Sequence, residues 1–143
     1  MTKTEILQAW YDQAWSRGDL SDLERFYTAD VTATGVVPSL PLNRNDFQDF
    51  VAALRHQVKQ IAISITQAVE QGEWLAARIE FNGCCAATDA PIQTTGQVMV
   101  RFKDGKMAQS YGQFDYITLF EQLGQLPQDT IAACLAGQGL TWR

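Results

Sequence analysis

Several residue types that carry chemistry are scarce in this sequence of 143 residues. It contains one histidine, three cysteines and four prolines, and its 11 lysines and arginines are outnumbered by 16 aspartates and glutamates. A single histidine, His56, excludes a metal centre built from several histidines, and we expect it at the surface. The net charge of −5 disfavours a phosphate backbone as a binding partner, so we expect no nucleic-acid partner.

The cysteines form neither a metal-binding spacing nor an even-numbered disulfide framework. We expect Cys84, Cys85 and Cys134 to be reduced, with a strained disulfide between the adjacent pair as the alternative. The first residues lack the apolar segment of a signal peptide, and no apolar run is long enough to span a membrane. We therefore expect a cytoplasmic protein without a membrane partner.

What is present is the composition of one globular domain, with 46% apolar and 19% charged residues. Apolar residues at helical intervals follow a capping box of Thr2 and Glu5 and predict a first helix that ends at Gly18. A second capping box, Ser21 with Glu24, predicts a short helix. A brief strand over residues 31–35 and a third helix over 47–58 follow, the latter capped by Asn43 or Asn45.

The second half of the chain alternates apolar and polar residues, which is typical of half-buried strands. The expected elements are strands over residues 61–66, 73–87, 92–103 and 106–116, and a short helix over 117–123. Helices followed by an antiparallel meander indicate an α+β fold in which the helices cover one face of a curved sheet. A weak helix over 129–136 and the tail beyond it form an appendage.

Three clusters of residues occur in a recognisable order along most of the chain. They are Trp15-x-x-Gly18-Asp19, the turn Asp104-Gly105-Lys106-Met107, and Asp115-x-x-x-Leu119-x-x-Gln122-Leu123-Gly124. Together they resemble the SnoaL-like branch of the nuclear-transport-factor-2-like superfamily. The resemblance implies a cone-shaped domain over residues 1–124 with an extension over 125–143. In it, three helices pack on a curved antiparallel sheet, enclose a pocket for a small molecule, and often form a homodimer.

Relatives of the cyclase and isomerase type use a carboxylate in an apolar pocket to move a proton beside a carbonyl. By this resemblance Asp115, in phase with Met107 and Tyr111 on the last strand, is the candidate acid–base residue. The alternative is that Asp115 is the N-cap of the next helix. We expect Trp15, Tyr11, Tyr111 and Arg78 to shape the pocket and bind its ligand, without a metal or an organic cofactor.

The same resemblance shows departures from the active relatives. Their acidic positions align with Thr34, Gly35 and Gly112 here. Arg78 and Glu80 are similar in placement to the Arg-x-Asp pair of limonene epoxide hydrolases, although both would lie on the solvent face if Leu75 to Phe81 turn their apolar side chains inward. Three functions therefore stay open: an acid–base enzyme that uses Asp115, an epoxide-hydrolase-like enzyme, and a non-catalytic ligand-binding or dimerisation module.

Overall fold

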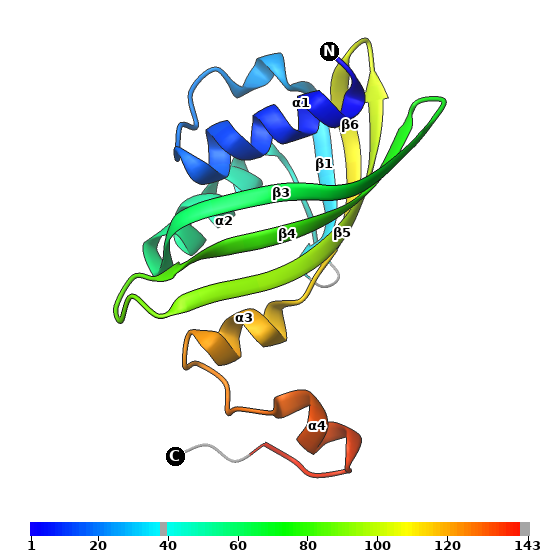
Figure 1. Cartoon of the computed structure of the whole chain (residues 1–143). Helices are drawn as coiled ribbons and strands as arrows, with labels where there is room; N and C mark the ends of the chain where they lie inside the picture. The colour runs from blue at the N-terminus through cyan, green and yellow to red at the C-terminus, as the bar shows by residue number, and fades with distance from the viewer. Residues whose placement is uncertain (38–39, 141–143) are drawn as a thin grey trace.

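The computed structural model describes residues 1–37 and 40–140 as a mixed α+β domain with a helical extension. Within these residues it has six strands, four α-helices, one π-helix and one 3₁₀ turn (Figure 1). In chain order they are α1 (Lys3–Trp10), η1 (Tyr11–Ser16), η2 (Leu23–Arg25), β1 (Tyr27–Val37), β2 (Leu40–Leu42), α2 (Arg44–Gln57), β3 (Val58–Gln71), β4 (Trp74–Cys85), β5 (Pro91–Lys103), β6 (Lys106–Phe114), α3 (Tyr116–Gln122) and α4 (Thr130–Leu135). The α+β architecture predicted from the sequence is confirmed.

The six strands form one curved sheet in the order β2-β1-β6-β5-β4-β3. Strands β3 to β6 are the predicted antiparallel meander, but β1 pairs in parallel with β6, where Thr34 lies opposite Tyr111. The expected curved sheet is therefore antiparallel through the meander and has one parallel pairing, β1 with β6. Because no hairpin joins β1 to β6, their relative direction is set by the path of the intervening chain and not by a turn.

One face of this sheet is covered by helices and the other is not. In Figure 1, α1 and α2 lie on the same side of the sheet. Along β4 the apolar side chains of Leu75, Ile79 and Phe81 are buried, while Arg78 between them is exposed. This alternation confirms the predicted inward face of β4.

The first helix continues to Ser16 as predicted, but its second half has π-helical hydrogen bonds. The amide of Arg17 donates to the carbonyl of Asp12, five residues earlier, at 3.0 Å. Trp10, Tyr11 and Trp15 lie on one face of this continuous helix and are all buried. This short segment therefore supplies three aromatic rings to the interior.

Of the caps predicted for the first three helices, two form and one does not. The Thr2 hydroxyl accepts from the amide of Glu5 at 3.1 Å, and Asn43 accepts from the amide of Asp46 at 2.9 Å, which decides between Asn43 and Asn45. The capping box at Ser21 is wrong. The Ser21 hydroxyl donates to Asp19 at 2.5 Å, and the 3₁₀ turn begins only at Leu23.

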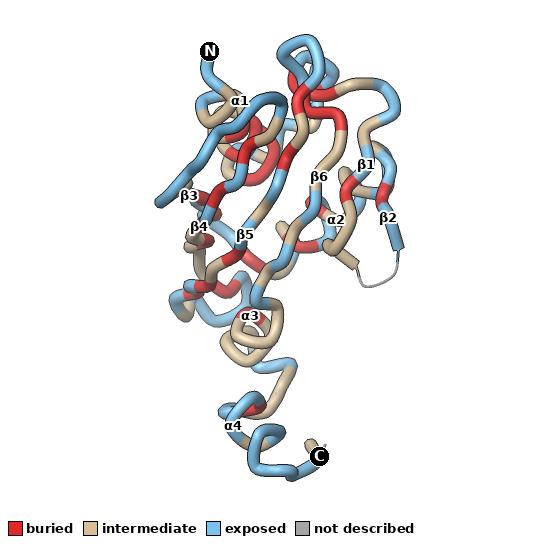
Figure 2. Tube along the Cα trace, turned by 90° about the vertical axis from the view of Figure 1, so that its right-hand side faces the viewer, coloured by how far each residue is buried: buried red, intermediate tan, exposed pale blue. Residues whose placement is uncertain are grey.

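The extension runs away from the sheet below α3 (Figure 1), and Figure 2 shows it as mostly exposed. Its helix α4 leaves Ile131 49% and Leu135 84% exposed. The predicted loop at Pro38 lies outside the described residues, and Pro41 belongs to β2. In the described part of the chain, no helix has the length and apolar character needed to cross a membrane. All three cysteines have free thiols.

Candidate functional site

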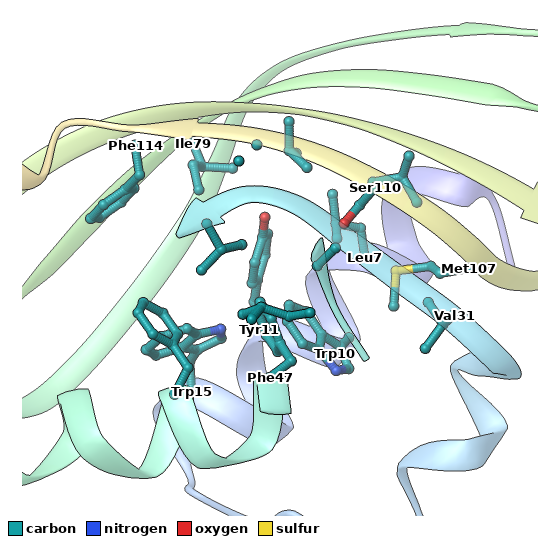
Figure 3. A pocket seen from close by; sticks show the side chains of 18 of the residues that line it. Leu7, Trp10, Tyr11, Trp15, Val31, Phe47, Ile79, Met107, Ser110 and Phe114 are labelled. Atoms are coloured by element: carbon teal, nitrogen blue, oxygen red, sulfur yellow. The ribbon is translucent and has the colours of Figure 1, made fainter. Parts of the chain in front are cut away.

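An apolar cavity of about 150 Å³ lies between the helices and the covered face of the sheet (Figure 3). Its walls come from α1, η1, β1, α2 and the middle of the sheet. The apolar lining includes Leu7, Val31, Phe47, Leu54, Ile63, Ile79, Val98, Val100, Met107 and Phe114. A cavity of this size can hold one benzene-sized ring.

Aromatic rings form the helical side of the cavity. Trp10 packs on Tyr11 and on Phe47, with ring centroids 5.2 and 5.4 Å apart. Trp15 meets Phe47 and Phe81 edge-to-face at 6.4 and 6.2 Å. Such edge-to-face contacts hold the rings in fixed orientations and present both faces and edges to the space between them. Tyr11 and Trp15 both line the cavity, and their expected contact with a ligand stays a prediction.

Few polar atoms interrupt this lining. Figure 3 shows the Tyr11 hydroxyl directed toward the strands and the Ser110 hydroxyl on the opposite wall. Burial raises the pKa of Tyr11 well above its usual value and raises that of Tyr116 to about 12, so both phenols stay protonated at neutral pH. The buried indole N–H of Trp10 has no acceptor among residues 1–37 and 40–140. The cavity therefore offers neutral hydrogen-bond donors.

A second polar group lies at the beginning of α2. The Gln48 side-chain amide donates to the Tyr27 hydroxyl at 2.9 Å, and Arg44 lines the same part of the cavity. Burial raises the pKa of Tyr27, the Gln48 hydrogen bond and the positive charge of Arg44 lower it, and Glu24 raises it. The cavity reaches solvent here, since the lining residues Thr32 and Asn43 are exposed.

Gly35 and Gly112, which align with acidic residues of the active relatives, lie next to each other in the structure. Gly35 has φ +93°, and a Cβ at this position would lie 2.1 Å from the carbonyl oxygen of Gly112. Both residues line the cavity, so backbone occupies the region where the resemblance would place carboxylates. A side chain at Gly112 would have open space, because the nearest atom to an added Cβ is 4.0 Å away.

Asp115 lies outside the cavity lining, at the N-terminus of α3. One carboxylate oxygen accepts from the Thr118 amide at 3.0 Å and the other from the Thr118 hydroxyl at 2.6 Å. The residue is exposed. The helix-cap alternative is therefore what the geometry gives, and a catalytic role for Asp115 stays a prediction that a variant must test.

Tyr111 and Arg78 point away from the cavity, which corrects their expected positions in the pocket wall. Tyr111 is 45% exposed, stacks on Trp74 with centroids 6.3 Å apart, and accepts from Gln109 at 2.7 Å. The cause is an extra residue, Ala108, at a bulge between β5 and β6. The bulge moves Tyr111 to the face opposite Met107, although alternation alone puts both on the same face. Arg78 is exposed on the same outer face as Tyr111.

Within the described residues, no group of three or more histidine, cysteine or acidic side chains could hold a metal ion. His56 is exposed on α2, as expected. Sequence reasoning missed Tyr27, Arg44 and Ser110 as lining residues. Ser110 could have been found only with the bulge in the register, whereas Arg44 carries no periodic signal because it precedes the apolar stripe of its helix.

Comparisons with known proteins agree with this architecture. Residues 5–123 match the sequence profile of the SnoaL-like polyketide cyclase family. The crystal structure of IdmH from Streptomyces antibioticus, a proposed polyketide cyclase, superposes with a TM-score of 0.74 at 20% identity over 86% of this chain and 99% of its own. A protein of Catenulispora acidiphila with a ketosteroid isomerase-like fold, solved with trimethylamine, gives 0.72 at 18% over 86% and 95%.

A proposed polyketide cyclase of Bacillus cereus gives a TM-score of 0.73 at 22% identity, over 84% of this chain and 76% of its own. Identities this low show the fold alone. None of the curated proteins matches this sequence.

Proposed function

Because the chain belongs to the SnoaL-like polyketide cyclase family, we propose that its cavity binds a small, largely apolar molecule. The observation that carries this proposal is the cavity itself, with about 150 Å³ of space and an aromatic wall built from Trp10, Tyr11 and Trp15. Burial of an apolar ligand against such a wall is favourable by about 25 cal/mol per Å² of apolar surface removed from water. Few convergent polar groups in an apolar cleft are typical of ligand sites.

The lining favours binding over acid–base catalysis. Among the described residues that surround the cavity there is no aspartate, glutamate or histidine. The phenols of Tyr11 and Tyr116 have raised pKa values, so neither takes up or releases a proton near neutral pH. We therefore propose that the protein binds a ligand without transforming it. The rival function is an enzyme that uses Asp115, and the variants below distinguish the two.

Binding is tested directly by titration with benzene and toluene, followed by tryptophan fluorescence and isothermal calorimetry. Ser110→Leu adds apolar volume inside the cavity and should abolish saturable binding. Arg78→Ala, on the outer face, should bind like the wild type and so also tests its expected role as a ligand contact. If neither hydrocarbon binds, or if the Ser110 variant binds like the wild type, the proposal is wrong.

The rival enzyme function needs a substrate, which protein purified from its own host can supply. Native mass spectrometry of that material should show a bound molecule. If the protein only binds this molecule, it should be released chemically unchanged. Release of a rearranged product by the wild type but not by Asp115→Asn would establish the enzyme instead.

We also propose that two copies associate through the outer face of the sheet. Tyr111 and Met99 are 45% and 49% exposed there, beside Trp74. Four strands of about twelve residues cover roughly 700–800 Å², close to the ~800 Å² that each partner buries in a stable interface. Sedimentation should show a dimer at micromolar concentration, and Tyr111→Arg should shift it to monomer. The matched control Leu135→Ser, on the extension, should stay dimeric; a monomeric wild type would contradict the proposal.

A further inference from the structure

Arg44 is the one charged residue among the described residues that line the cavity. It is partly exposed and begins α2, one turn before Phe47, whose ring packs on Trp10 inside the cavity. The guanidinium therefore stands at the point where an apolar, aromatic space meets solvent.

The guanidinium is not neutralised by a neighbour. The ion pairs formed between side chains of residues 1–37 and 40–140 are Lys59 with Asp89 and Arg101 with Glu73, both elsewhere on the molecule. Glu24 lies close enough to act on the charge of Tyr27 but forms no ion pair with Arg44 in this part of the chain. An arginine beside an apolar cavity is thus left free to pair with an anion from outside.

A further donor accompanies this charge. The Tyr27 hydroxyl accepts its hydrogen bond from Gln48 at 2.9 Å, which leaves the phenolic proton free to donate to another acceptor. Guanidinium and hydroxyl donors suit the two oxygens of a carboxylate, and charge-assisted hydrogen bonds are the stronger ones.

We propose that the ligand of this site is a small monocarboxylic acid whose apolar body, about one aromatic ring, fills the cavity while its carboxylate pairs with Arg44 and the Tyr27 hydroxyl. This inference rests on the proposed binding function and names the chemical class of the ligand. Volume limits the body to about one ring, since a cavity of this size holds benzene. The position of Arg44 determines where the negative charge of the ligand lies. Because the guanidinium is at the solvent side of the cavity and not among the buried rings, the carboxylate lies at that side.

The experiment compares 3-phenylpropionate with 3-phenylpropanamide, which have nearly the same shape and differ in charge. Calorimetry at low salt should give a Kd for the acid about tenfold lower than that for the amide, equivalent to one charge-assisted contact. Added salt should weaken binding of the acid and leave the amide unchanged. Arg44→Gln should remove the preference, Arg44→Lys should keep part of it, and the outer-face control Arg101→Gln should keep all of it.

The outcomes separate this inference from the function on which it rests. If toluene and the amide bind but the acid has no advantage, or if Arg44→Gln keeps the preference, the carboxylate assignment is wrong and the binding function stands. If no probe binds to the wild type, both are wrong. Thermal unfolding of each variant checks that a lost preference is not a lost fold.

Discussion

Replacing Gly35 with alanine should lower the free energy of unfolding by about 2–5 kcal/mol. A left-handed φ of +93° disfavours a residue with a Cβ, at a cost of roughly 1–2 kcal/mol. The new Cβ would also lie 2.1 Å from the carbonyl oxygen of Gly112, and overpacking of this kind costs about 1–3 kcal/mol. The sum of these two costs gives the expected range.

Urea unfolding followed by tryptophan fluorescence measures this change, with thermal unfolding as a second readout. The matched control is Gly72→Ala, which has φ +59° but no atom within 4 Å of the added Cβ. It should cost only the conformational part, roughly 1–2 kcal/mol. The difference between the two variants isolates the contact between Gly35 and Gly112.

If Gly35→Ala costs no more than Gly72→Ala, then the close approach of β1 to β6 is not a rigid feature of the pocket. The same reasoning predicts that Gly112→Ala is milder than Gly35→Ala, because its Cβ would have open space. A carboxylate could thus be introduced at Gly112, whereas Gly35 does not accept one.

Three further results are expected. Asp115→Ala should lower the free energy of unfolding by about 0.5–2 kcal/mol through loss of the α3 cap, while Asp115→Asn should keep most of it; equal losses would contradict the cap. Burial raises the pKa of Tyr116 to about 12, so the wild type should lose stability as pH rises from about 10 to 12, where only the unfolded phenol ionises. Between pH 9 and 11, Tyr116→Phe should lose less free energy of unfolding than the wild type, as measured by urea unfolding. Equal losses in the two proteins would refute the assignment of this pH dependence to Tyr116. A chain ending at Gly124 should keep its fold, with a Tm within a few degrees of the full chain, because α4 packs little against the body; a chain that fails to fold would show that residues 125–143 belong to the domain.

The fold could be predicted from the sequence because the patterns that indicate it are local. Alternation on β3 and β4, the capping residues Thr2 and Asn43, and the turn at Gly105 each depend on neighbours a few residues away. Such patterns establish the element order and the inward face of β4 without any knowledge of tertiary contacts.

Only part of the candidate site could be predicted from the sequence. Tyr11 and Trp15 belong to the apolar stripe of the first helix, and the family resemblance implied that this helix lines the pocket. Tyr111 was misplaced because the bulge at Ala108, which reverses the two faces of β6, has no glycine or proline to mark it. Nothing in the local sequence distinguishes Arg44 from the other arginines on the surface.

The sequence by itself determined the order of helices and strands, the apolar faces, and the absence of carboxylates at Gly35 and Gly112, since each follows from residue types and their spacing. Beyond Tyr11 and Trp15, the tertiary structure alone decided which side chains surround the cavity. It put Arg44 and Tyr27 at the wall, and Asp115 at a helix cap outside it. The physical reason is that a cavity wall is made by residues far apart in the chain, brought together by sheet curvature, a parallel β1–β6 pairing and one inserted residue.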